Sequence, residues 1–431
     1  MMNRVIALAV FLTFSHPIWI EGSNFACSIQ SDSDVFVRDV LEVPNGGFLC
    51  AVNAGDGGLA KLDRSGNIAW IRRYSGPGNG LLVLDRTVDG GYILGGLRMM
   101  YPDPYDAWII RTDAKCRTLW EKAYGGRRTE WVDTVKQTSD GGYIMGGFTT
   151  SFGHGNDAWI VKLDSTGHVT WERVFGARER EFCVATWEHP EGGYIAVSFV
   201  GSTGHGDVNV MKLDTAGNAV WQKNYGSPRA ERPCSAAATF DGGCIICGVT
   251  AGYGSEKDAW VFKLGPDGQI EWQKRYGGAG TDLADSVRQT TDGGYVVCGS
   301  TLGDNAADSS AWMLRLDKQG EIASQKSFVC AGYYGRLTFI METSRQGIIA
   351  AGYLESQLPP WGFDSLVLSL SGNLTMPAID CPYLASTSVV AKETESISSP
   401  STWILRSTHC EVNETMTPAT ETSFAVIGFC Q

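Results

Sequence analysis

The residue types that carry out catalysis occur in this chain, but not at the spacings that known chemistry needs. The sequence holds no HExxH, no GxSxG, no phosphate-binding GxxxxGK[ST] and no EF-hand calcium loop. His154 and His205 occupy comparable loops of consecutive repeats, an arrangement that would suit a shared metal. Because each lies beside glycine in a loop, we interpret both as solvated side chains. The sequence therefore predicts no catalytic residue, no metal site and no cofactor.

Cysteine spacing offers a second candidate for chemistry. Cys244-x-x-Cys247 has the spacing of a redox pair or half a zinc site, but residues three apart on a strand point to opposite faces. We interpret the cysteines at apolar strand positions as buried thiols: Cys50, Cys244, Cys247 and Cys298. Three cysteines outside the repeats are the better disulfide candidates, with their pairing open: Cys381, Cys410 and Cys430.

The residues best suited to binding are arginines and aromatic residues in segments of irregular length. Arginine binds carboxylates in a two-pronged manner, and arginine and aromatic residues dominate binding interfaces. In a chain of net charge −12, they would suit a carboxylate-bearing glycan or an acidic protein loop. The predicted ligand-binding residues are Arg98, Tyr101, Arg127, Arg128, Trp131, Arg178, Arg180, Arg229, Arg232, Tyr333 and Trp361. The alternative is that these arginines form salt bridges between neighbouring repeats.

Evenly spaced Gly-Gly turns organise most of the chain. The turn segments start 44 to 53 residues apart, at Asn45, Asp89, Asp140, Glu191, Asp241, Asp292 and, in a degenerate copy, Arg345. The clearest copy contains four β-type segments, at 132–138, 143–149, 157–164 and 168–175. Repeats of this length with two turns and no helical pattern are typical of β-propellers. We therefore predict an all-β propeller, most simply of seven four-stranded blades.

Two sets of constant residues have local structural reasons. The first glycine of each Gly-Gly turn is expected to adopt a positive φ: Gly90, Gly141, Gly192, Gly242 and Gly293. One tryptophan per repeat follows the second turn by four residues and is expected to pack one blade on the next: Trp70, Trp120, Trp171, Trp221 and Trp272. These positions predict structure and not binding.

The order of the strands also predicts which face of the propeller binds. In an up-and-down blade, the connections between strands one and two and between strands three and four lie on one face, here called the turn face. The other connections lie on the opposite face, here called the loop face. The loop-face connections are longer and varied, and binding residues are found on such loops above a rigid scaffold.

These repeats resemble a known class of proteins. The segments QTSDGGYIMGG (137–147) and DAWIVKLDSTG (157–167), followed by W-x-x-x-(Y/F)-G (171–176), are similar to the repeats of secreted prokaryotic propeller proteins, most without an assigned activity. The resemblance covers about residues 35–372 and implies a propeller but no particular activity. A weaker likeness to the tryptophan-docking repeats of quinoprotein dehydrogenases fails on the Asp-to-Gly spacing, the repeat number and the lack of an adjacent Cys-Cys pair.

The segments outside the repeats complete the predicted organisation. Residues 1–22 have the pattern of a secretory signal peptide, and no later stretch is apolar enough to span a membrane. The propeller is expected over 31–379, and the Ser/Thr-rich 380–431 as a small β appendage or closure segment, with a stalk-like tail as the alternative. A secreted or cell-surface protein is expected, with acceptor sequons at Asn373 and Asn413.

Charge and motifs together narrow the function. Acidic residues outnumber basic ones, 47 to 35, which argues against a nucleic-acid partner. The hypothesis that remains in front is a non-catalytic recognition or adhesion scaffold for an extracellular glycan or protein. The alternative is a propeller enzyme, either glycan-acting or quinoprotein-like, whose carboxylates would gather in a central channel without a sequence motif.

Overall fold

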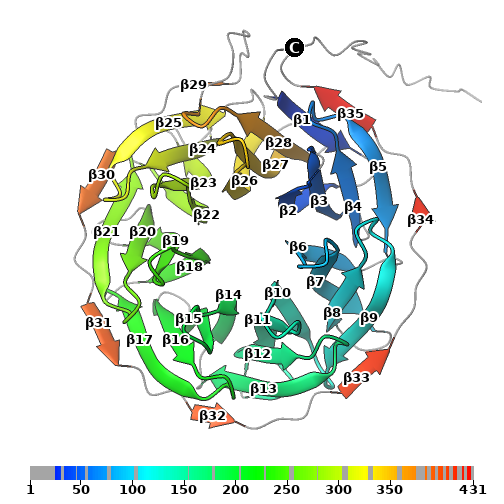
Figure 1. Cartoon of the computed structure of the whole chain (residues 1–431). Coiled ribbons are helices and arrows are strands. Elements are labelled where there is room, and N and C mark those ends of the chain that lie inside the picture. Colours follow the sequence, from blue (N-terminus) through cyan, green and yellow to red (C-terminus); the bar gives the residue numbers. More distant parts are fainter. Residues whose placement is uncertain are drawn as a thin grey trace, which may run out of the picture.

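The chain folds as a ring of seven β-sheets around a central axis, as predicted (Figure 1). The computed structural model describes residues 25–374 except 31–33, 45, 54–56, 75–78, 101–104, 154, 177–179, 203–204, 228–229, 252–256, 279, 303–308, 329–332 and 357–361. Beyond residue 374 it describes the backbone of seven short strands. Among all the described residues, no helix has the length and hydrophobicity needed to span a bilayer.

Each blade contains four antiparallel strands, numbered here from the axis outward. Blades one to three are β2 (Phe36–Glu42), β3 (Phe48–Asn53), β4 (Gly57–Leu62) and β5 (Ile68–Arg73); β6 (Gly80–Arg86), β7 (Tyr92–Met99), β8 (Tyr105–Thr112) and β9 (Thr118–Gly125); β10 (Glu130–Gln137), β11 (Tyr143–Thr149), β12 (Asp157–Leu163) and β13 (Val169–Gly176). Blades four and five are β14 (Arg180–Glu188), β15 (Tyr194–Ser202), β16 (His205–Leu213) and β17 (Ala219–Gly226); β18 (Glu231–Ala238), β19 (Cys244–Thr250), β20 (Asp258–Leu264) and β21 (Ile270–Gly277). Blades six and seven are β22 (Asp282–Gln289), β23 (Tyr295–Leu302), β24 (Ser309–Leu316) and β25 (Ile322–Phe328); β26 (Tyr333–Glu342), β27 (Ile348–Ser356), β28 (Phe363–Leu370) and β1 (Phe25–Gln30).

The outer parts of the blades pack through the conserved tryptophan and the glycine of the second turn. A Cβ atom added to Gly167 of the next blade would lie only 2.9 Å from the ring of Trp120. The Tyr124 hydroxyl donates a 2.7 Å hydrogen bond to the Gly167 carbonyl oxygen. Gly167 also has a φ of +81°, so the position needs glycine for two reasons. Trp171, Trp221 and Trp272 stand in the same relation to the turn glycines of their neighbours.

Blade seven is completed by the N-terminal strand. β1 pairs with β28, and Phe25 takes the place of the missing tryptophan, with its ring against Gly66 of blade one. The boundary predicted at residue 31 leaves this strand outside the propeller. No repeat pattern indicates β1, because this segment lacks the Gly-Gly turn and the tryptophan by which the repeats are recognised.

The C-terminal segment surrounds the propeller as a belt, defined here as the seven strands β29 to β35 (orange to red in Figure 1). These strands are β29 (Leu384–Ala385), β30 (Val390–Glu393), β31 (Ile397–Pro400), β32 (Ile404–Arg406), β33 (Glu411–Glu414), β34 (Thr420–Glu421) and β35 (Ala425–Gly428). Each pairs with the outermost strand of one blade, in the order six, five, four, three, two, one and seven. The last of them pairs with β1, so both terminal segments meet in blade seven.

The turn face is held by one repeated hydrogen bond between neighbouring blades. In five blades a backbone N–H of the first turn donates to a side chain at the end of the next blade's first strand, over 2.6 to 2.8 Å. The donor and acceptor pairs are Val88 and Gln137, Ser139 and Glu188, Phe240 and Gln289, Thr291 and Glu342, and Ser344 and Glu42. The other two donor positions hold Pro44 and Pro190, which have no N–H, and the facing positions hold Arg86 and Ala238.

The two kinds of turn glycine predict different costs on substitution. Gly141→Ala places a methyl group in open space at a φ of +80°, so it should cost about 1–2 kcal/mol of unfolding free energy from the backbone alone. Gly167→Ala has the same backbone cost and also pushes against Trp120, so it should cost more. Urea unfolding of both variants measures the difference, and equal losses would show that the tryptophan contact contributes little.

The belt predicts a second effect on stability and assembly. Removing residues 380–431 leaves the outer edge of every blade without a partner, and open strand edges pair with other chains. The truncated protein should unfold at a lower temperature and form oligomers, as measured by calorimetry and by gel filtration with light scattering. A truncated protein that stays monomeric with an unchanged midpoint would show that the belt does not protect the edges.

Candidate ligand-binding cavity at the propeller axis

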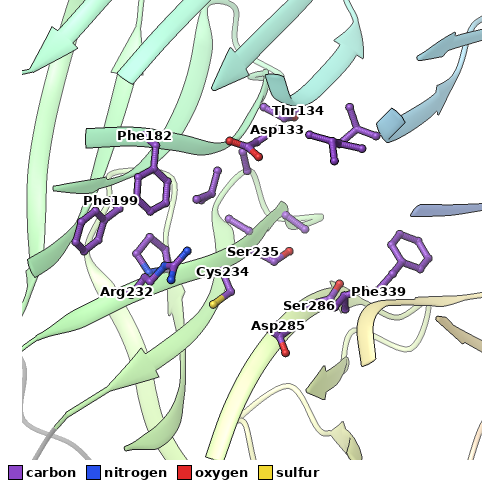
Figure 2. Close-up of a pocket in the computed structure, with 18 of the residues that line it drawn as sticks. Asp133, Thr134, Phe182, Phe199, Arg232, Cys234, Ser235, Asp285, Ser286 and Phe339 are labelled. Carbon is purple, nitrogen blue, oxygen red and sulfur yellow. The ribbon is translucent and has the colours of Figure 1, made fainter. Parts of the chain in front are cut away.

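A cavity of about 870 Å³ lies at the centre of the ring (Figure 2). Its wall is formed mainly by the first strand of each blade: β2, β6, β10, β14, β18, β22 and β26. Because each of these strands is the inner edge of its sheet, its side chains meet those of the other blades around the axis. All seven blades therefore contribute side chains to a common surface at the cavity.

Every first strand carries a β-bulge at the same position of the repeat. The bulged residues, in blade order, are Arg38, Leu82, Asp133, Val184, Cys234, Asp285 and Thr338. A bulge sets two residues opposite one on the partner strand, so two consecutive side chains turn to one side. Each bulged residue and the one after it line the cavity, which gives the wall two rings of side chains.

The backbone groups that the bulges free are bonded by the neighbouring blade. The Asp39 carboxylate accepts the N–H of Leu84 in the next blade at 2.9 Å. The Cys247 thiol lies 3.6 Å from the carbonyl oxygen of Ala284, one residue before the next bulge, and donates to it. Cys298 does the same for blade seven. These cysteines are therefore buried thiols with a packing role, as the sequence indicates, and burial raises the pKa of both well above the usual value.

Aromatic and cationic side chains line the loop-face end of the cavity. Trp131, Phe182 and Arg232 each precede a bulge by two residues and come from blades three, four and five. The Trp131 ring stacks on Phe148 at 6.0 Å, and the Phe182 ring stacks on Phe199 at 5.0 Å. The Arg232 guanidinium lies 5.4 Å above the Phe182 ring (Figure 2). These contacts fix the orientation of flat surfaces that a ligand could cover.

The cavity wall carries more basic than acidic side chains. Six basic residues line it, Arg38, Lys136, Arg232, Lys257, Arg288 and Arg336, against four acidic ones, Asp39, Asp133, Glu231 and Asp285. Asp285 is held by Arg336 through two hydrogen bonds of 2.6 and 2.8 Å. The wall therefore has a net positive charge inside a protein of net charge −12.

Asp133 is the most perturbed carboxyl group of the wall. Burial raises its pKa to about 7, and the hydrogen bond from Trp131 and the charges of Arg232 and Arg38 oppose the rise. The indole N–H of Trp131 donates to Asp133 over 2.9 Å. Burial also raises the pKa of Asp39, to about 6. Near neutral pH, part of the acidic charge of the cavity is therefore absent, which increases its positive character.

The predicted binding residues divide among several places. Trp131 and Arg232 line the cavity. Arg98 forms a 2.8 Å ion pair with the buried Glu121 of its own blade, and Tyr333 packs on a hydrophobic core. Three arginines are exposed and lie outside the cavity wall: Arg127, Arg128 and Arg180. Four predicted residues lie outside the described part of the chain: Tyr101, Arg178, Arg229 and Trp361.

Most of the cavity wall lies outside the predicted set. Arg336 was expected on the binding face, but Arg38, Asp133 and Asp285 were not, although all four line the cavity. A signal for the last three exists in the repeats. The bulged position differs in chemistry from blade to blade, while the residue before it is apolar in every blade. A variable position inside a regular strand marks a side chain that faces no constant partner.

Two further titratable groups of the wall have fixed environments. The Cys234 thiol lines the wall, but burial raises its pKa to about 12, so it is a poor nucleophile near neutral pH. Both carboxylate oxygens of Asp285 accept hydrogen bonds from the Arg336 guanidinium. Among the described residues, no group of three His, Cys, Asp or Glu side chains is arranged to hold a metal ion.

Comparison with known proteins finds distant structural similarity and no similar sequence. No protein-family model and no curated protein matches the chain. A protein of unknown function from Bacteroides caccae is similar in structure, with 14% identity over 68% of this chain and 93% of its own and a TM-score of 0.43. YCF48 bound to D1 peptide is 12% identical over 83% of this chain and 99% of its own, with a TM-score of 0.45. The holo PQQ domain of pyranose dehydrogenase from Coprinopsis cinerea is 12% identical over 80% of this chain and 95% of its own, with a TM-score of 0.39.

Asp133 predicts a pH dependence of stability. Its folded pKa of about 7 lies above the ordinary aspartate value near 3.9, so the folded protein binds the proton more tightly. Stability should therefore fall as pH rises from about 4 through 7. Asp133→Asn, which keeps an acceptor for Trp131, should unfold with less dependence on pH. Urea unfolding of both proteins at pH 5 and pH 8 measures this, and parallel changes would contradict the perturbed carboxyl.

Proposed function

We propose that this protein is a non-catalytic recognition scaffold that binds an anionic ligand, a glycan or a protein segment, at the loop-face end of its central cavity. The observation that carries the proposal is the wall itself, in which Arg232, Trp131 and Phe182 from three blades converge on one cavity. Rigid aromatic residues with arginine are the side chains that bind most strongly at interfaces. The scaffold around them is fixed by contacts between blades.

The electrostatic contrast supports an anionic ligand. The surrounding protein is acidic, and it repels anions except where the positive cavity attracts them. A ligand carboxylate at Arg232 would replace water around the exposed guanidinium and form a charge-assisted hydrogen bond with it. The exposed Arg127 and Arg128 lie in the connection between blades two and three and would attract the same ligand from solution.

The proposal places this activity outside the cell. The predicted signal peptide at 1–22 and the sequons at Asn373 and Asn413 are its basis, and the disulfide candidates Cys381, Cys410 and Cys430 agree with it. Asn373 is exposed in the last turn of blade seven, where a sugar chain would meet no obstacle from the core. Intact-mass measurement of secreted protein before and after deglycosylation tests the location and the sequons together.

Arg232 provides the direct test of the binding site. Arg232→Ala should weaken binding of acidic glycans or peptides at least tenfold and leave thermal unfolding almost unchanged, because exposed charges contribute little to stability. Arg127→Ala with Arg128→Ala should slow association and reduce its salt dependence. Arrays of acidic glycans and acidic peptides supply the ligands, and biolayer interferometry supplies the rates.

Arg98→Ala is the matched control. It removes an arginine on the same face, but one that neutralises the buried Glu121, so it should lower the unfolding temperature and leave ligand affinity unchanged. If Arg232→Ala binds every ligand as the unmodified protein does, the cavity is not the binding site.

A further inference from the structure

The wall of the central cavity is uneven around the axis. In blade five, every residue from Ala230 to Ala238 lines it, including residues that in other blades face a neighbouring sheet. Val249 of the second strand is also reached. The cavity therefore extends along β18, and on the side of blade four it is also lined by Phe182, Val184 and Trp187; this extension is here called the slot. Ala236 lies on that side, whereas Ala237 packs against the core between blades five and six.

The slot exists because blade five carries small side chains where the other blades carry large ones. Its first strand ends in Ala236, Ala237 and Ala238. The residues at these three positions in blade three are Val135, Lys136 and Gln137, and in blade six Val287, Arg288 and Gln289. The remaining blades also have residues larger than alanine there, such as Ile340, Met341 and Glu342 in blade seven. The space in blade five corresponds to side chains that the repeat normally provides.

The slot also uncovers a strand edge. β18 is the terminal strand of its sheet and pairs on one side only, with β19. Its other edge faces the cavity. Pro233 has no N–H and the bulge at Cys234 interrupts the spacing, so the regular row of backbone N–H and carbonyl groups is the segment 235–238. With small side chains along it, this edge is accessible to an extended chain, which can add to the sheet as a further strand.

We propose that the ligand of the cavity is an extended peptide end that pairs with β18, with its carboxylate at Arg232. This deepens the proposed function and rests on it. Arg232 stands at the loop-face start of β18, so a peptide with its C-terminal carboxylate there runs antiparallel to β18, with its N-terminal end near Ala237. Five residues of strand span about 17 Å, so the slot accommodates about five peptide residues.

The composition of the slot favours a peptide over a glycan. Sugars need polar side chains around their hydroxyl groups. After Ser235, β18 contributes three alanines, and Val249, Val184 and Trp187 add apolar surface, so the polar groups lie mainly at the Arg232 end. An extended peptide satisfies its own polar groups on the strand edge and places alternate side chains into the apolar space. Small or medium apolar residues are therefore expected at the peptide positions that face the alanines.

The experiment uses the full-length protein and synthetic arrays of pentapeptides, each made with a free C-terminal carboxylate and as an amide. Fluorescence polarisation on the selected peptides gives affinities. The carboxylate form should bind at least tenfold more tightly, and this preference should disappear in Arg232→Ala. Each selected peptide is then methylated on one backbone amide at a time. Methyl groups on alternate amides should weaken binding at least tenfold, because only alternate N–H groups of an added strand face its partner.

A variant of the slot tests the same geometry from the protein side. Ala236→Val, Ala237→Met and Ala238→Gln together introduce uncharged residues that occur at these positions in Val135, Met341 and Gln137. Ala236 is buried in a core beside Trp187, so Ala238→Gln alone, at an exposed position, serves as a second variant that should unfold as the unmodified protein does. Pentapeptide affinity should fall at least tenfold in the triple variant, and it should also fall in Ala238→Gln. Acidic oligosaccharides serve as the comparison ligands in every arm.

The outcomes separate this inference from the proposed function. Equal effects of methylation at every amide, or unchanged affinity in the filled-slot variant, would overturn pairing with β18. Binding of acidic glycans that depends on Arg232, without binding of peptides, would overturn the peptide ligand and leave the anion-binding cavity standing. If Arg232→Ala binds peptides and acidic glycans as tightly as the unmodified protein does, the peptide inference and the proposed function are both wrong.

Discussion

The structure depends on how the first strands of the blades meet around the axis. A bulge in each of them turns two consecutive side chains toward the centre and breaks the regular pairing within the sheet. The freed backbone groups are then bonded by the neighbouring blade, as in the contacts of Asp39 with Leu84 and of Cys247 with Ala284. One local irregularity therefore both couples the blades and forms the wall of the cavity.

The repeats are complementary to one another and not copies of one another. On the turn face, the two blades whose donor position is proline, Pro44 and Pro190, face neighbours without the usual acceptor. At the outer edge, Phe25 replaces tryptophan where the ring closes on blade one. Because the main strand contacts of each described blade are with its two neighbours and its part of the belt, such paired changes can occur at one junction without disturbing the rest.

The sequence predicts the blades well because their constant residues solve local problems. Asp140 accepts hydrogen bonds inside its own turn, and Trp120 packs on the next turn, so both repeat with the period of the fold. The belt and β1 were not predictable in this way. A belt strand such as β29 has two residues, and its position depends on the edge of a blade that is already folded. Periodicity within a sequence carries no information about pairing of that kind.

The residues of the candidate site vary from repeat to repeat, whereas the residues that determine the fold are constant. The side chains that line the cavity are those at which the repeat varies, from Arg38 to Asp133 to Cys234, because the axis places no constant partner in front of them. Blade five departs furthest, with three alanines in succession below Arg232. Larger residues occupy these positions in every other blade, and beside Ala236 the neighbouring blade supplies Trp187. The space that remains along β18 is what the proposed peptide would fill.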